Sequence, residues 1–140
     1  ASFLNSMIVM RLGMRRLISA ALRIQILWSL GMLVLYAQGL MAGDLGFALF
    51  IFWIFGLFFQ AGMTLGNLTA LAMEPLGHIA GTAASVTSAV ATLGSILLAS
   101  MAGQFFDGTP LVMLIAIFAW SICGSLSAHR LKRFDRTRAL

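Results

Sequence analysis

The sequence predicts an all-α membrane protein with four transmembrane helices and the end of a fifth. Hydrophobic residues make up 61% of its 140 residues and charged residues only 9%, whereas a soluble domain carries about 25% charged residues. Its mean hydropathy is +1.00, and the few charges separate long uncharged segments. In lipid the backbone must satisfy its own hydrogen bonds, so each such segment is expected to be a helix.

Charged residues divide the chain into four segments that can each cross a bilayer. Twenty uncharged residues lie between Arg23 and Asp44, 29 between Asp44 and Glu74, 32 between Glu74 and Asp107, and 22 between Asp107 and Arg130. A span needs about 20 residues. We expect spans near residues 18–41, 46–66, 80–102 and 110–128. The three regions are then a truncated helix with a basic cytoplasmic loop (1–17), a four-helix membrane region (18–128) and a basic cytoplasmic tail (129–140).

The nine basic residues are confined to the two ends of the chain, and the net charge is +5. Four spans return the chain to its starting side, so all nine fall on one side of the membrane. The positive-inside rule makes that side cytoplasmic, together with the loop at residues 67–79. Topology explains the positive charge without nucleic acid as a partner. The basic residues are Arg11, Arg15, Arg16, Arg23, Arg130, Lys132, Arg133, Arg136 and Arg138.

The first span has Gln25 and Gln38 near its ends, where we expect them to anchor it at the interfaces. In the second span Trp53, Gln60, Thr64 and Asn67 recur at spacings of seven, four and three, which places them on one helix face. Such a stripe either forms hydrogen bonds between helices or lines a wet substrate cavity with Trp53 and nearby phenylalanines as its wall. Both interpretations stay open at this point.

The third and fourth spans differ in their surfaces. The third is rich in Gly, Ala and Ser four residues apart, a pattern that favours close packing on other protein helices. The fourth is more uniformly aliphatic, begins at Pro110 and is expected to be peripheral. It contains the single cysteine, Cys123, which we expect to be buried and inert.

No catalytic, metal or cofactor site is expected. Glu74 and His78 are four residues apart, but no third ligand completes a metal site and no nucleophile lies nearby. An ion pair or a helix-end cap is the simpler interpretation of this pair. No carboxylate lies in the middle of a span, so a proton-coupling residue would have to lie outside this chain.

Three stretches carry a family resemblance. The first is the run Asn67, Ala70, Leu71, Ala72, Glu74, Pro75, Gly77, His78, Ala80, Gly81, Thr82, Ala83 and Ser85. It resembles the loop between the tenth and eleventh helices of Bcr/CflA-type drug resistance transporters of the major facilitator superfamily. The second motif, Arg11, Gly13, Arg15 and Arg16, resembles the second copy of that superfamily's cytoplasmic loop signature, without the acidic residue of the first copy. Residues 103–110 resemble the family's last outer loop.

The resemblance implies a fold and an activity. The chain would be the end of helix eight and helices nine to twelve of a twelve-helix transporter, in a bacterial inner membrane, and would need the missing N-terminal helices for activity. The family exports drug-like or small metabolite molecules in exchange for protons by rocking two halves around a midplane site. Helices ten and eleven border its cavity, which favours the cavity interpretation of Trp53, Gln60 and Thr64, with Phe52, Phe55 and Phe59 as wall residues. The alternative is a small four-helix membrane subunit with a structural or assembly role, packed on its partner through Gly62, Gly66 and the third span.

Overall fold

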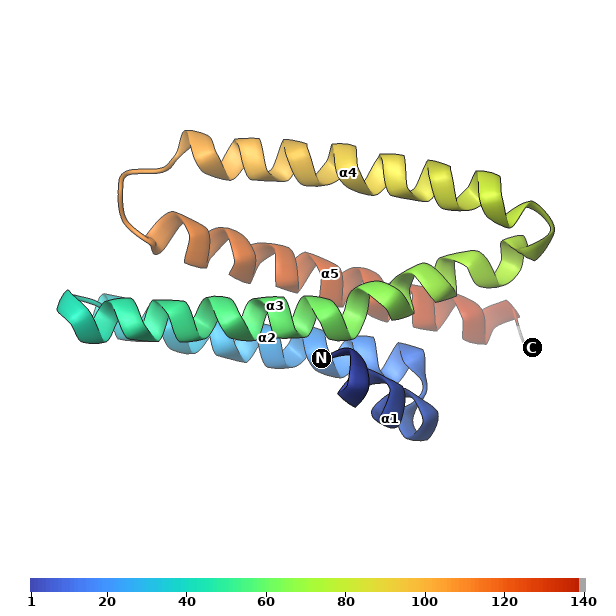
Figure 1. Cartoon of the computed structure of the whole chain (residues 1–140), viewed down its shortest axis with the longest axis horizontal. Coiled ribbons are helices and arrows are strands. Elements are labelled where there is room, and N and C mark those ends of the chain that lie inside the picture. The colour runs from blue at the N-terminus through green and yellow to red at the C-terminus, as the bar shows by residue number, and fades with distance from the viewer. Residues whose placement is uncertain (139–140) are drawn as a thin grey trace.

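A computed structural model describes residues 1–138, and all regular secondary structure in this range is helical. Helix α1 spans Ser2–Leu12, α2 Met14–Ala37, α3 Gly43–Met73, α4 Ala80–Gln104 and α5 Leu111–Arg138, and a 3-10 segment, η1, joins α3 to α4 at Glu74–Ile79. The four long helices run alternately back and forth along one direction (Figure 1). The all-helical class predicted from the hydropathy is confirmed for the described residues.

Three helical segments are long and apolar enough to cross a membrane: Met14–Ala37, Gly43–Gln104 and Leu111–Arg130. The middle segment has 62 residues, which as one straight helix would be about 93 Å long. That is about three times the thickness of the hydrocarbon core. η1 folds the segment back on itself, so that α3 and α4 are two antiparallel helices (Figure 1). Leu76, with φ −115° and ψ 20°, interrupts the helical backbone there.

The ends of the helices differ from the expected spans in the first, second and last regions. α3 runs over Gly43–Met73 instead of 46–66, so the first half of the loop expected at residues 67–79 is helical. α2 begins at Met14 instead of residue 18, because only Gly13 separates it from α1. It ends at Ala37 instead of residue 41, because Gly39 takes a φ of +74° and the chain turns there. The expected basic loop is therefore mostly helical. At the other end α5 continues to Arg138, through most of the segment expected to be a tail.

The core lies where α2, α3 and α5 meet. Met32, Trp53 and Leu114 form its buried centre, and Trp53 and Leu114 are completely buried. The indole of Trp53 stacks on Phe50 at a ring-centroid distance of 5.8 Å. Trp28 of α2 meets Phe52 of α3 edge to face at 5.3 Å. The Trp28–Phe52 contact joins α2 to α3 in the halves of these helices that lie toward the α2–α3 loop.

α4 stands apart from this core. Ala83 is its one buried residue, and its contacts with α3, η1 and α5 are few compared with those α2 makes with α3 and α5. Figure 1 shows α4 meeting the rest of the bundle at its two ends. Most of the small residues of α4 that were expected to pack on other protein helices are therefore exposed.

Two positions in the spans differ in burial from the sequence expectations. Cys123 is exposed, not buried, because it lies on the face of α5 that points away from α2. Gln25 is not an interfacial anchor, since only 3% of its surface is exposed. It lies on the face of α2 that carries Ala21 and Met32.

The basic segments lie at one end of the bundle. α1, η1 and the C-terminal end of α5 are together at that end, and the α2–α3 and α4–α5 loops are at the other (Figure 1). The helix arrangement thus brings these segments of the backbone to the same end of the bundle.

Candidate functional site

The polar stripe on α3 is the candidate site that the sequence analysis singled out. Trp53, Thr64 and Asn67 are buried, and Gln60 is half-buried. They share one helix face, which lies against α1 and α2, and at its Trp53 end it joins the buried cluster that contains Leu114 of α5. The predicted stripe is thus present, and it points into the bundle.

Gln60 and Thr64 satisfy each other within α3. The Gln60 amide Nε2 donates to Thr64 Oγ1 at 3.4 Å, and that hydroxyl donates to the Gln60 carbonyl oxygen at 3.0 Å. Neither side chain forms a hydrogen bond to another helix among the described residues. Both are therefore able to exchange these local bonds for bonds to water or to a bound molecule.

Asn67 has a different role, because it joins two helices. Its Nδ2 donates to Asn5 Oδ1 of α1 at 2.6 Å and to the Met63 carbonyl oxygen at 2.8 Å. The same pair of helices approaches closely at Gly62, where an added Cβ would lie 2.8 Å from the Cβ of Ala1. One part of the Gly62/Gly66 face is thus already covered by α1, while nothing lies within 4 Å of a Cβ placed at Gly66.

Trp53 is enclosed in the core, and its indole nitrogen has no hydrogen-bond partner. An indole N–H without a partner in a low-dielectric core is costly. The Nε1 of Trp28 is in the same situation. Two unused donors therefore lie between α2 and α3.

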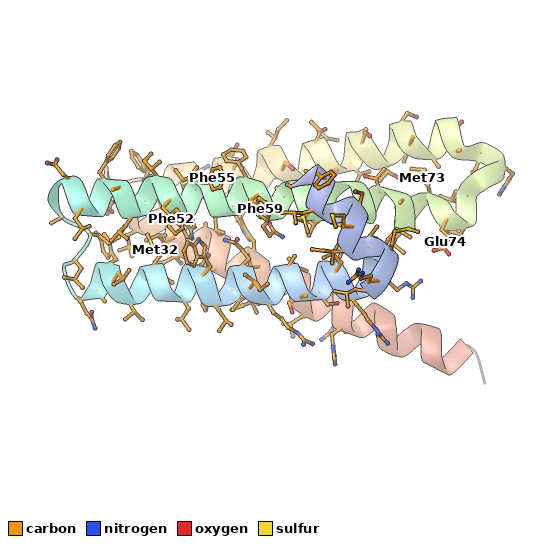
Figure 2. The ribbon with its side chains drawn as sticks, turned by 60° about the horizontal axis from the view of Figure 1, so that its bottom comes forward. Met32, Phe52, Phe55, Phe59, Met73 and Glu74 are labelled. Atoms are coloured by element: carbon orange, nitrogen blue, oxygen red, sulfur yellow. The ribbon has the colours of Figure 1, made fainter. Side chains whose placement is uncertain are left out.

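Phe52, Phe55 and Phe59 lie on another face of α3. They are 59%, 67% and 37% exposed, and Figure 2 shows them along the helix. The structure thus does not bring the six cavity candidates to one surface: Trp53, Gln60 and Thr64 point into the bundle and the three phenylalanines do not.

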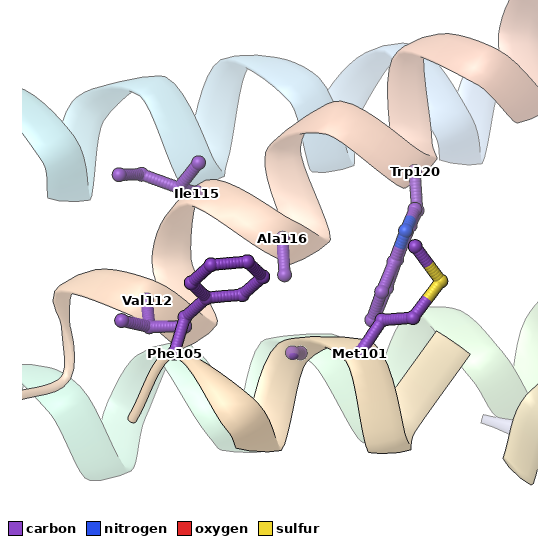
Figure 3. A pocket seen from close by; sticks show the side chains of 7 residues that line it. Met101, Phe105, Val112, Ile115, Ala116 and Trp120 are labelled. Carbon is purple, nitrogen blue, oxygen red and sulfur yellow. The ribbon is translucent and has the colours of Figure 1, made fainter. Parts of the chain in front are cut away.

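Two apolar hollows open on the surface, and neither includes any of the six candidates. One has a volume of about 280 Å³ and lies between α4 and α5 (Figure 3), where it is lined by Met101, Phe105, Val112, Ile115, Ala116 and Trp120. The other, of about 350 Å³, lies between the α2–α3 and α4–α5 loops and includes Phe47, Phe50, Phe106 and Met113.

The loop motif begins on α3 with the buried Asn67, continues through η1 and ends on the first turns of α4. Glu74, Pro75, Gly77 and His78 are exposed in η1. In the described part of the chain Glu74 and His78 take part in no hydrogen bond or ion pair, so the expected pairing is absent. The rest of the motif, Gly81, Thr82 and Ser85, is exposed on the first turns of α4, where Ser85 Oγ donates to the Thr82 carbonyl oxygen.

The basic motif forms the corner between α1 and α2. Gly13 takes a φ of +77°, which favours glycine, and its N–H donates to the Val9 carbonyl oxygen at 2.9 Å. The chain thus makes a tight turn between the two helices. Arg11, Arg15 and Arg16 are exposed around it.

The α4–α5 loop is ordered by Asp107. Its Oδ1 accepts hydrogen bonds from the hydroxyl and the backbone N–H of Thr109, at 2.6 and 2.9 Å. The Thr109 hydroxyl, followed by its N–H, lowers the pKa of the Asp107 carboxyl from its ordinary value.

Sequence reasoning missed the polar residues that other helices contribute to the interior. Asn5 is the partner of Asn67. Gln25 and Ser29 are buried on α2, where Gln25 Nε2 donates to Ser29 Oγ at 3.1 Å, and Ser121 is buried on α5. The spacing of Gln25, Ser29 and Met32 on one face of α2 is the signal that could have revealed the α2 pair.

Comparison with protein-family models, with curated proteins and with solved structures finds no match for this chain.

Proposed function

We propose that this chain is the C-terminal part of a proton-coupled membrane exporter of drug-like or small metabolite molecules. The observation that carries the proposal is the residue run from Asn67 to Ser85. It resembles the helix ten to eleven loop of Bcr/CflA-type transporters of the major facilitator superfamily over thirteen positions. In that proposal α2 to α5 are helices nine to twelve, and α1 is the end of helix eight.

The arrangement of the helices supports the proposal without deciding it. The run occupies a sharp turn between two antiparallel helices, each long enough to cross a bilayer. α3 carries Gln60 and Thr64 within its span, and their hydrogen bonds are local and exchangeable. Polar side chains inside a membrane helix are expected to face a cavity or a partner helix.

In the proposed mechanism, the stripe on α3 would contribute one wall of a midplane site. Gln60 supplies an amide donor and acceptor, and Thr64 a hydroxyl, to polar groups of an amphipathic substrate. Trp53 is enclosed in the core and the three phenylalanines lie on another face, so these four side chains would take part only if α3 turned or its neighbours moved. The proton-coupling acid and the remaining helices would come from outside this chain.

A transport assay tests the proposal. Two proteins are reconstituted in proteoliposomes with a fluorescent drug-like cation and an imposed pH gradient. One is this chain alone, and the other is the extended product, encoded by the reading frame continued upstream of Ala1. We expect proton-driven flux from the extended product only. Gln60→Ala and Thr64→Val should each lower its rate by about fivefold, the effect of losing one polar contact of about 1 kcal/mol in a membrane. Thr69→Ala, which removes an exposed hydroxyl bonded to its own helix, serves as the control. An extended product without proton-driven flux would refute the proposal.

The second candidate function is a structural membrane subunit. The exposed small-residue faces of α4 favour it, because a partner helix could pack closely on them. Labelling of a Gln60→Cys variant, in a Cys123→Ala background, with a water-soluble maleimide separates the two functions. Reaction at Gln60→Cys means that the stripe meets water, as a transporter requires, and its absence favours the structural role.

A further inference from the structure

The outward face of α2 combines two arginines with an apolar surface. Arg16, Arg23, Leu27, Leu30 and Val34 follow one another at spacings of seven, four, three and four, so they lie along one stripe. All five are exposed. The opposite face of the same helix carries the buried residues, among them Ile18, Ala21, Gln25, Ser29 and Met32. This arginine stripe therefore points away from the α2–α3–α5 core.

Arg16 and Arg23 lie at different positions along the axis of α2, but both side chains can reach the headgroup region of the membrane. Seven residues separate them, which is about 10 Å along the helix axis. Cα–Cβ bonds in a helix tilt toward its N-terminus, so the side chain of Arg23 extends toward Arg16. An arginine next to a hydrocarbon layer also lays its aliphatic stem along the apolar surface and places its guanidinium in the headgroup region. Both guanidiniums thus converge on the headgroups at the basic end of the bundle.

Among the side chains that the structure describes, no acidic group neutralises these two arginines. Arg16 and Arg23 take part in no hydrogen bond or ion pair among the described side chains. The first turn of α2 contains no acidic residue. At this end of the bundle Glu74 is the acidic residue whose side chain is described, and it also forms no ion pair. The stripe therefore combines two positive charges that no described side chain pairs with and, next to them along α2, an exposed aliphatic surface.

We propose that the arginine stripe binds one anionic phospholipid. Arg16 and Arg23 hold its phosphate, and Leu27, Leu30 and Val34 contact its acyl chain. A soluble phosphate would use the arginines alone, whereas a lipid uses both halves of the stripe, so the combination selects a lipid. The net negative charge of the headgroup is required, because a zwitterionic headgroup brings its own cation to the site. This proposal does not depend on the export function.

Native mass spectrometry of the full chain tests the proposal. The protein is released from mixed vesicles of phosphatidylglycerol and phosphatidylcholine, and the retained lipids are counted. We expect the wild type to retain phosphatidylglycerol preferentially. Arg16→Gln and Arg23→Gln should each reduce this preference by about fivefold, the effect of one basic residue near an anionic surface. Arg23→Lys should keep most of it.

Arg130→Gln is the matched control, because it removes the same charge from an exposed arginine on a different helix, α5. It should leave the preference unchanged. Circular dichroism shows whether each variant keeps its helices, and Leu27→Ala tests the apolar half in a variant that keeps every charge. An equal loss in Arg130→Gln would mean that only net charge matters and would overturn the proposal. An unchanged preference in the Arg16→Gln/Arg23→Gln double variant would assign these arginines to topology alone and would overturn it as well.

Discussion

At the residue scale, the hydrogen bond between Asn5 and Asn67 joins side chains 62 positions apart in the sequence, with a donor–acceptor distance of 2.6 Å. It ties α1 to the end of α3, close to the turn that carries the loop motif. Because Asn67 also donates to the Met63 carbonyl oxygen, its amide orientation is fixed from both sides. The bond thus determines where α1 crosses α3.

Removing this bond should destabilise the bundle measurably. Asn5→Ala and Asn67→Ala are each expected to lower the free energy of unfolding, and a double-mutant cycle should give a coupling of about 0.5 to 1.5 kcal/mol, the range for such bonds in membranes. Thermal unfolding in detergent gives the values. Thr69→Ala, which removes a hydroxyl bonded only to its own helix, should change little. A coupling near zero would mean that the two amides do not meet.

The pKa of the Asp107 carboxyl reports on the hydrogen bonds of the α4–α5 loop. Its pKa is lowered by the Thr109 hydroxyl and then by the Thr109 N–H. A carboxyl whose pKa is lower in the folded state contributes stability above its unfolded pKa and loses that contribution as the pH falls through its folded pKa. The loop is therefore expected to loosen only in acid, below the ordinary range of an aspartate.

Carbon NMR of the Asp107 carboxyl, followed as a function of pH, checks whether Thr109 lowers its pKa. In Thr109→Val the pKa should rise toward the ordinary aspartate value, because the strongest donor is lost. In Thr109→Ser the hydroxyl remains, so the pKa should stay low. The same pKa in all three proteins would contradict the assignment to the hydroxyl.

At the scale of the helices, α2 and α3 pack closely at Gly56. A Cβ at this position would lie 2.9 Å from Trp28 Nε1, and Trp28 is itself held against Phe52. The indole has little room to move away. The fit of these two helices therefore depends on a missing side chain.

Gly56→Ala should weaken the α2–α3 contact. Inserting a methyl group into a packed interface costs about 1 to 3 kcal/mol, so thermal unfolding in detergent should occur at a lower temperature. Gly66→Ala on the same helix is the control, because nothing lies within 4 Å of its added Cβ. It should be neutral or slightly stabilising, since alanine has the higher helix propensity. Equal effects at both positions would mean that propensity, not packing, decides them.

At the scale of the whole molecule, the 62-residue segment Gly43–Gln104 decides how many times the chain crosses the membrane. Its fold at η1 makes it two antiparallel helices, which allows four crossings in all, and places the α2–α3 and α4–α5 loops at the end opposite η1. The excess of arginine at the η1 end favours its location in the cytoplasm.

Labelling of introduced cysteines with an impermeant maleimide tests this topology in a Cys123→Ala background. His78→Cys, in η1, should react only after the cytoplasmic side is opened. Asp44→Cys, at the start of α3, should react in intact cells. Both positions are exposed, so accessibility differs only through the membrane. Reaction of both from the same side would exclude a membrane-spanning α3.

The sequence by itself determined the helical class, the approximate ends of the helices and the polar stripe on α3. These follow from local quantities: the length of each uncharged segment, the hydrogen bonds that lipid cannot supply and the spacing of Gln60, Thr64 and Asn67 on one face. The break at Gly13 was also predictable, because only its own backbone conformation is involved.

Which face of each helix packs against its neighbours is known only from the tertiary structure. Trp53 is enclosed while Phe52, Phe55 and Phe59 stay exposed, although all four belong to one aromatic segment. Their burial depends on where α2 and α5 lie, and in a helix that is apolar on every side hydrophobicity does not mark the face that packs. The Asn5–Asn67 bond and the buried Gln25 depend in the same way on contacts between residues far apart in the chain, which local spacing does not determine.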